Sequence, residues 1–180
     1  PPSSRSFFYV VNEIPYAILD GGAQPAYRFD FETSTPNSSL LKKLTLEDPQ
    51  FDLDVKYRFF ETGIKVSADV QALKDLESKD RVLHLAIAEK KVSGHSGLGN
   101  DTVFMNVVID MIPSPAGTLY PGAWNRNDEE SYTWFWNYSK VDEVELTDLF
   151  VVAFIQERDS RKVLQVASAD ASEYPLTVSD

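Results

Sequence analysis

The sequence predicts a mainly β protein: an immunoglobulin-like antiparallel two-sheet sandwich of about seven strands, preceded by a small α/β appendage made of a hairpin and a helix. Three observations support this fold class. Seven segments between residues 53 and 169 have strand character. In the clearest of them, Gly63–Leu73, apolar and polar side chains alternate, which is typical of a strand with one face in water. Clusters of turn-forming residues separate the segments, as in Greek-key sandwiches.

The first 31 residues predict a β-hairpin. Short β-like segments lie at Phe7–Val11 and Tyr16–Leu19, on either side of Pro15. Asp20-Gly21-Gly22 is a strong turn signal, because glycine readily adopts the left-handed backbone that tight turns need. We therefore expect Ala26–Phe31 to return as an antiparallel strand.

A short helix is predicted after this hairpin. Thr35-Pro36-Asn37-Ser38 has the character of a helix N-cap segment, and Ser39–Leu46 carries leucines that fall on one side of a two-turn helix. Asp48-Pro49 ends the helix, because proline cannot continue it. The predicted division of the chain is therefore an appendage of residues 1–48 and a sandwich domain of residues 49–180.

The sandwich strands are predicted from alternation and from a high content of β-branched and aromatic residues. They are expected at Leu53–Phe60, Gly63–Leu73, Arg81–Glu89, Thr102–Ile112, Ser131–Tyr138, Leu149–Gln156 and Lys162–Ala169. Glu61-Thr62-Gly63 and Arg158–Arg161 are expected to form hairpin turns. Pro113–Gly122 is rich in proline and glycine and predicts a long irregular connection.

Composition excludes several classes of protein. The formal net charge is −11 and the pI is about 4.6, which argues against sequence-independent binding to nucleic acid or to anionic membranes. Cysteine is absent, so disulfide scaffolds, thiolate zinc sites and cysteine nucleophiles are excluded. The longest uninterrupted apolar run is Leu149–Ile155, whereas a membrane-spanning helix needs about 20 residues. We therefore expect no transmembrane segment in this chain, and we assign no cofactor.

An aromatic cluster is the strongest candidate for a binding function. Seven aromatic residues fall within 19 positions: Tyr120, Trp124, Tyr132, Trp134, Phe135, Trp136 and Tyr138. Four of them share parity on one predicted strand and should point to one side of it. Two interpretations remain open. The rings fill the sandwich core or cover a sheet edge, which we favour, or they form an exposed platform for glycan or protein. On the second interpretation the candidate ligand-binding residues are Trp124, Tyr132, Trp134, Trp136 and Tyr138.

No catalytic residue and no metal site is assigned. His84 lies in an apolar strand and is interpreted as structural, and His95 lies in a glycine-rich loop without a specified partner. Asp52 and Asp54 are expected to share one strand face. Asn125–Glu130 concentrates oxygen ligands but lacks the residue order and the glycine of an EF-hand, so we expect a solvated acidic loop there.

The appendage resembles a known fold. Asn12–Gly22, with its Ile14-Pro15 step, resembles the second half of a thioredoxin-like domain, in which a strand opened by a cis-proline is followed by a hairpin and a final helix. The resemblance implies a cis bond at Pro15. It also implies that the redox half, which carries a pair of cysteines in that family, would lie before Pro1.

The sandwich has a resemblance of its own. Met111–Thr118, Phe150–Glu157 and Lys162–Ala167 resemble the β-sandwich that follows a thioredoxin-like domain in Omp28-related and other secreted or surface proteins of Bacteroidetes. The resemblance covers roughly residues 49–170. It implies an extracytoplasmic location, in the periplasm, on the outer-membrane surface or secreted.

The leading functional hypothesis is a noncatalytic extracytoplasmic module of unknown ligand, which acts as a spacer or interaction domain of a larger surface or secreted protein. One alternative is a carbohydrate-binding module that uses the aromatic strand. The other is a fragment of a thioredoxin-like redox protein that lacks its active half. The expected partner is an unknown protein or glycan and not a nucleic acid, and the sequence does not predict an oligomeric state.

Overall fold

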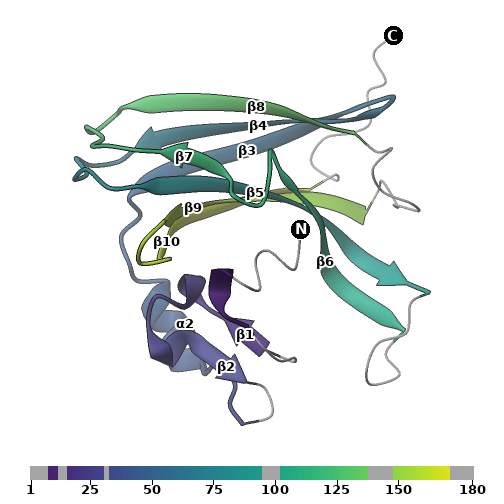
Figure 1. The fold of residues 1–180 in the computed structure, drawn as a ribbon, viewed down its shortest axis with the longest axis horizontal. Helices are drawn as coiled ribbons and strands as arrows, with labels where there is room; N and C mark the ends of the chain where they lie inside the picture. The colour runs from purple at the N-terminus through teal and green to yellow at the C-terminus, as the bar shows by residue number, and fades with distance from the viewer. Residues whose placement is uncertain (1–7, 12–15, 31–32, 95–101, 138–147, 171–180) are drawn as a thin grey trace.

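The computed structural model describes residues 8–11, 16–30, 33–94, 102–137 and 148–170. In that part the chain is mainly β, which confirms the predicted fold class (Figure 1). The strands, the 3-10 turns (η) and the helix follow one another as β1 (Tyr16–Ile18), η1 (Asp20–Gly22), η2 (Pro25–Tyr27), β2 (Arg28–Asp30), α2 (Ser38–Leu44), β3 (Phe51–Phe60), β4 (Gly63–Ala72), β5 (Arg81–Ser93), β6 (Val103–Ile112), β7 (Thr118–Tyr120), β8 (Glu129–Asn137), β9 (Leu149–Glu157) and β10 (Val163–Asp170).

Two antiparallel sheets form the sandwich (Figure 1). One sheet has the order β3-β4-β8. The other has the order β10-β9-β5-β6, and β7 pairs with the first residues of β5. The sheets can be compared with those of an immunoglobulin domain by giving the strands their usual letters. The sheet β3-β4-β8 then corresponds to strands A, B and E, and the sheet β10-β9-β5-β6 corresponds to strands G, F, C and C′. This is the arrangement of an immunoglobulin-like sandwich in which a C′ strand extends the second sheet.

The core lies between the sheets, and most of it is built by every second residue of β3, β4, β5 and β9. On β3 and β4, Val55 and Ile64 point inward, and on β5 Leu85 meets them from the opposite sheet as part of one buried cluster. The hydroxyl of Tyr57 donates a hydrogen bond of 3.0 Å to the carbonyl oxygen of Leu149, which joins the two sheets directly. Burial of these apolar side chains is the main force that holds the layers together.

The appendage contains the predicted hairpin and helix. β1 and β2 pair antiparallel, from Tyr16 opposite Asp30 to Ile18 opposite Arg28. The side chain of Asn37 accepts a hydrogen bond of 2.8 Å from the backbone N–H of Leu40, so Asn37 is the N-cap of α2, within the segment in which the start of the helix was predicted.

The appendage is docked on the turn between β9 and β10. A carboxylate oxygen of Asp20 accepts a hydrogen bond of 2.8 Å from the backbone N–H of Val163. The neighbouring Gly21 lies so close to the hairpin that an added Cβ would be 1.8 Å from the carbonyl oxygen of Arg161. The hydroxyl of Tyr9 also donates to the side-chain carbonyl of Gln156 on β9, at 3.2 Å.

Two expectations about secondary structure were wrong. Phe8 and Tyr9, expected in a β-like segment, lie in a helical turn. The connection Pro113–Gly122, expected to be irregular throughout, contains β7, which pairs with Arg81–Leu83. Alternation over so few residues carries little information, so the surrounding fold decides both segments. The one cis peptide bond among the described residues joins Ile112 to Pro113.

Candidate functional site

Three members of the aromatic cluster, Tyr120, Trp124 and Trp136, lie in the buried core. Trp136 and Trp124 are 1% and 6% exposed, and both belong to the main buried cluster. The indole N–H of Trp136 on β8 donates a hydrogen bond of 3.0 Å to a carboxylate oxygen of Asp110 on β6, across the two sheets. The ring of Tyr120 on β7 packs against Trp124 and against Tyr132, at centroid distances of 5.5 and 4.9 Å.

Tyr132 and Trp134 are only half-buried. Their rings stack 5.5 Å apart with an interplanar angle of 11°, and both pack against the core cluster from β8. Burial raises the pKa of the Tyr120 and Tyr132 hydroxyls, so both remain protonated at neutral pH. Inward-pointing rings on one strand agree with the core interpretation. A ligand-binding role for these residues stays a prediction, and Tyr138 and Pro15 lie outside the described residues.

The predicted acidic and histidine features have structural roles in the described part of the chain. The carboxylate of Asp128 accepts a hydrogen bond of 2.7 Å from the backbone N–H of Asn125 and so closes a turn, whereas Glu129 and Glu130 already belong to β8. Among the described residues, no group of three or more His, Asp or Glu side chains could hold a metal ion. His84 is 3% exposed and stacks on Phe154, with ring centroids 4.8 Å apart. His95 lies outside the described residues.

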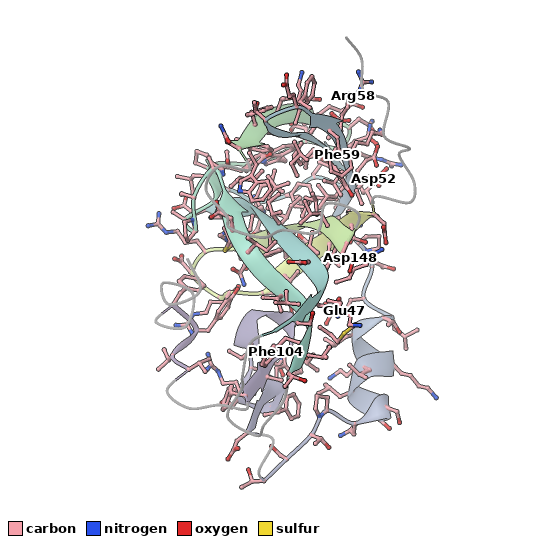
Figure 2. All side chains as sticks on the ribbon, turned by 90° about the vertical axis from the view of Figure 1, so that its right-hand side faces the viewer. Glu47, Asp52, Arg58, Phe59, Phe104 and Asp148 are labelled. Atoms are coloured by element: carbon pink, nitrogen blue, oxygen red, sulfur yellow. The ribbon has the colours of Figure 1, made fainter. Side chains whose placement is uncertain are left out.

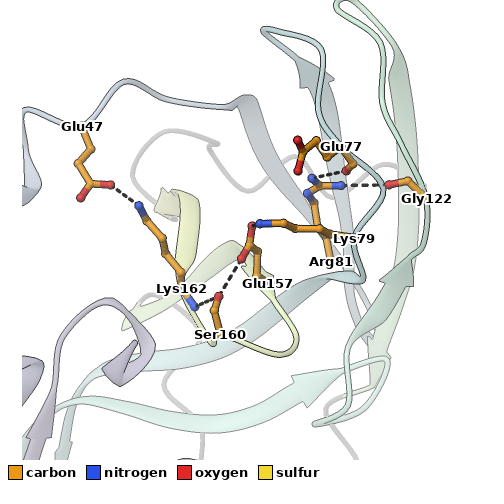
Figure 3. A network of polar contacts seen from close by, with 8 residues as sticks. All are labelled: Glu47, Glu77, Lys79, Arg81, Gly122, Glu157, Ser160 and Lys162. Carbon is orange, nitrogen blue, oxygen red and sulfur yellow. Dashed lines mark hydrogen bonds and ion pairs between the residues drawn. The ribbon is translucent and has the colours of Figure 1, made fainter. Parts of the chain in front are cut away.

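A chain of polar contacts crosses the end of the sandwich (Figure 3). The ammonium group of Lys162 pairs with the carboxylate of Glu47 at 2.5 Å, which raises the pKa of Lys162. The backbone N–H of Lys162 donates to the hydroxyl of Ser160, and that hydroxyl donates to Glu157 at 2.8 Å. Lys79 donates to the other carboxylate oxygen of Glu157 at 2.9 Å. The segment after α2 is thereby linked to the β9–β10 hairpin.

Glu157 is the centre of this network, and its replacement gives a pH-dependent prediction. Burial alone would raise its pKa, but the hydrogen bonds from Lys79 and Ser160 outweigh burial and hold the pKa below the ordinary value of 4.5. A lowered pKa means that the charged group stabilises the fold above that ordinary value, and that this contribution disappears as the pH falls through the folded-state pKa. Glu157→Gln is therefore expected to lower the free energy of unfolding by about 1 kcal/mol at pH 7.

The measurement is urea denaturation of both chains between neutral pH and about pH 3, where the difference should approach zero. Glu61→Gln, at an exposed position in the β3–β4 turn, is the matched control and should change stability little at either pH. A difference for Glu157→Gln that stays constant with pH would contradict the assignment.

The outer face of the β3-β4-β8 sheet has segregated charges. We call it the bipolar face and define it by the outward residues of five cross-strand rows. The rows are Asp52, Gln71 and Glu129; Asp54, Asp69 and Ser131; Lys56, Ser67 and Thr133; Arg58, Lys65 and Phe135; and Phe60, Gly63 and Asn137. The first two rows are acidic, and the basic residues gather in the next two. Phe60 and Phe135 are 42% and 52% exposed beside the basic rows.

The charged side chains of the bipolar face are exposed. Along β3, Asp52 and Arg58 lie on the outer side of the sheet, and Phe59 packs toward the core (Figure 2). Lys56 forms an ion pair with Asp54, and the hydroxyl of Ser131 donates to Asp69. The sequence predicts that Asp52 and Asp54 share a face, and the structure confirms it. The neighbouring rows were missed, because only the register of three strands brings them together.

Comparison with known proteins gives a likeness of fold. No protein-family model matches the chain, and no curated protein matches its sequence. HBP35 of Porphyromonas gingivalis superposes with a TM-score of 0.60 at 10% identity, over 79% of this chain and 47% of that one. A domain of the outer membrane lipoprotein Omp28 from Porphyromonas gingivalis has a TM-score of 0.46 at 12% identity, over 68% of this chain and 88% of that one.

A third solved structure is a mutant β-glucosidase from Listeria innocua in complex with laminaribiose. It has a TM-score of 0.32 at 11% identity, over 67% of this chain and 16% of that one. This chain spans about half the length of HBP35, and the likeness to that protein concerns the fold alone.

Proposed function

We propose that the chain is a noncatalytic extracytoplasmic module that serves as a spacer or interaction domain in a longer surface or secreted protein. The observation that carries the proposal is the docking of the appendage on the sandwich. A spacer must hold its two ends at a fixed distance, so its parts must not move independently. The Asp20–Val163 hydrogen bond, the close approach of Gly21 to Arg161 and the Glu47–Lys162 ion pair join the appendage to the β9–β10 hairpin at three points.

Two further observations support a module of a longer protein. In HBP35, the region that shares this fold makes up about half of the protein's chain. The sequence resemblance to Omp28-related proteins of Bacteroidetes agrees with the bacterial source of that structure, and it is the reason for proposing an extracytoplasmic location. An interaction domain needs an accessible surface that a partner can recognise. The bipolar face is accessible, and its acidic and basic residues are segregated into separate rows.

The other two hypotheses have less support. Glycan binding would use rings that are free to stack on a sugar, whereas most of the aromatic strand packs against the core. The hairpin and helix of the appendage have the order that the thioredoxin-like resemblance implies, but a redox role would need residues that this chain does not contain. Both hypotheses remain predictions.

The proposal can be tested by measuring whether appendage and sandwich move as one body. Because the chain has no cysteine, two introduced cysteines accept spin labels without background. Lys43→Cys on α2 and Ser168→Cys on β10 are exposed positions on the two parts. Pulsed electron spin resonance should give one narrow distance distribution.

The control pair is Thr133→Cys with Ser168→Cys, which compares two strands of the sandwich, and the two distributions should have similar widths. A distribution for the Lys43–Ser168 pair that is much broader than the control would overturn the spacer role. A substrate turned over by the chain, with the turnover abolished by a single substitution, would overturn the noncatalytic assignment.

A further inference from the structure

We propose that the bipolar face binds the bipolar face of a second copy of the chain, in a two-fold symmetric dimer. The inference rests on the proposed role as an interaction module and names its partner. It starts from the charges that each copy leaves exposed on one sheet face.

The acidic half of the bipolar face consists of its first two rows, and the basic half consists of the next two. Each half contains two like charges directly opposite one another. Asp54 on β3 is in register with Asp69 on β4, and four residues along the strand Arg58 is in register with Lys65. Like charges at directly opposite positions destabilise a sheet. Among the described residues, no ion pair joins Arg58 or Lys65 to a carboxylate. A partner that brings opposite charges to both halves would relieve this repulsion in both.

A second copy brings those charges only in one orientation. Two copies packed face to face about a two-fold axis that runs across the strands keep each strand over its own equivalent and reverse the order of the rows. Asp54 then lies over Arg58 of the second copy, and Asp69 lies over Lys65 of the second copy. Each contact occurs twice by symmetry. Lys56 lies on the axis, over Lys56 of the second copy, and each of these two ammonium groups is paired with Asp54 of its own copy, so Asp54 lies between Lys56 of its own copy and Arg58 of the second.

The other in-plane axis gives the opposite result. An axis parallel to the strands keeps the order of the rows, so Lys65 of one copy would lie over Lys65 of the other, and Asp69 over Asp69. The charge pattern therefore selects one of the two face-to-face arrangements. Pairing through the free edge of β3 or β8 would leave Lys65 and Asp69 on the central strand β4 out of contact, so substitutions on β4 test the face and not the edge.

The size of the face predicts a weak dimer. Ten residues of strand extend about 33 Å, and three strands span about 14 Å, so each copy contributes roughly 450 Å². The total of roughly 900 Å² is below the 1,200 Å² or so that stable interfaces bury. The net charge of −11 on each copy also opposes association. We therefore expect association that depends on concentration in the micromolar range, measured at about 0.15 M salt, where the repulsion between distant charges is screened.

The test is sedimentation equilibrium of the full chain, of Lys65→Glu, of Asp69→Lys and of an equal mixture of the two variants. Each variant alone sets like charges against one another twice in its homodimer, and its association should be at least about tenfold weaker than that of the unmodified chain. In the mixture, a heterodimer restores opposite charges at both positions, so association should return to nearly the original strength.

Net charge alone predicts a different result. Asp69→Lys makes the chain less negative, so general repulsion alone would strengthen its association, whereas the proposed interface predicts a loss. Lys74→Glu is the matched control for Lys65→Glu, because it makes the same charge change at an exposed position outside the bipolar face, and it should associate like the unmodified chain. Thermal unfolding establishes that each variant is folded.

Three results would each overturn the proposal: an unmodified chain that stays monomeric up to about 500 μM, variants that associate as strongly as the original, or a mixture that does not recover. Spin-labelled chain diluted into an excess of unlabelled chain reports only distances within one copy, so these distances do not depend on self-association. A monomeric chain with a narrow distance distribution would remove the dimer and leave the spacer role in place.

Discussion

Trp136→Ala is expected to lower the free energy of unfolding by about 3–5 kcal/mol, the range for removing a fully buried large aromatic side chain. The indole is 1% exposed and belongs to the main core cluster between the sheets. Its N–H also donates to Asp110 on the opposite sheet, at 3.0 Å. The substitution thus leaves a cavity and removes the donor of a contact that joins β8 to β6.

Urea denaturation monitored by far-ultraviolet circular dichroism measures the loss. Phe135→Ala is the matched control, because Phe135 is the neighbouring residue on β8 but points to the outer face and is 52% exposed. It should cost less than about 1 kcal/mol. A similar loss for the two substitutions would contradict the assignment of Trp136 to the core and Phe135 to the surface.

Gly21→Ala is the second substitution with a large expected effect, and it acts on the docking of the appendage. Gly21 has a φ of 61°, in the left-handed region that favours glycine. An added Cβ would lie 1.8 Å from the carbonyl oxygen of Arg161 and 2.4 Å from the side-chain nitrogen of Gln156. A backbone atom cannot move aside cheaply, so the docked arrangement should lose about 2–4 kcal/mol.

Hydrogen exchange separates this local effect from global unfolding. The backbone N–H of Val163, bonded to Asp20, should lose protection in Gly21→Ala, while inward-facing residues of β5 such as Leu85 keep theirs. Gly22→Ala is the control. Gly22 also has a left-handed φ, of 68°, but its added Cβ would meet only side-chain atoms at 3.1 Å. Equal losses at Val163 in both variants would mean that backbone conformation, and not the contact with Arg161, controls docking.

Much of the fold could be predicted from the sequence because its signals are local. Alternation in Gly63–Leu73 and turn residues such as Glu61-Thr62-Gly63 specify strands and hairpins without knowledge of their partners. β7 could not be found in this way. The first three residues of β5 extend beyond the part that pairs with β6, and Thr118–Tyr120 takes that free edge. Only the assembled sheet creates the place that this segment fills.

The candidate site shows the same limit. The shared parity of Tyr132, Trp134 and Trp136 was enough to favour the core interpretation. The bipolar face depends instead on which residues of β3, β4 and β8 lie opposite one another. β4 and β8 are separated by 56 residues of sequence, so their register is set only when the chain folds. The alternating charges of β3 alone are compatible with any solvated strand face.

The positions at which the chain enters and leaves the sandwich determine how it responds to mechanical force. Phe51, the first residue of β3, lies beside Arg81 at one end of the strands, and Asp170, the last residue of β10, pairs with Lys90 at the other. Tension between these points runs along the strands, so the hydrogen bonds of β3 to β4 and of β10 to β9 are loaded together in shear and not opened one after another. Forced unfolding is governed by the unfolding rate, and a domain loaded in this way resists a steady pull better than one whose end strands peel off.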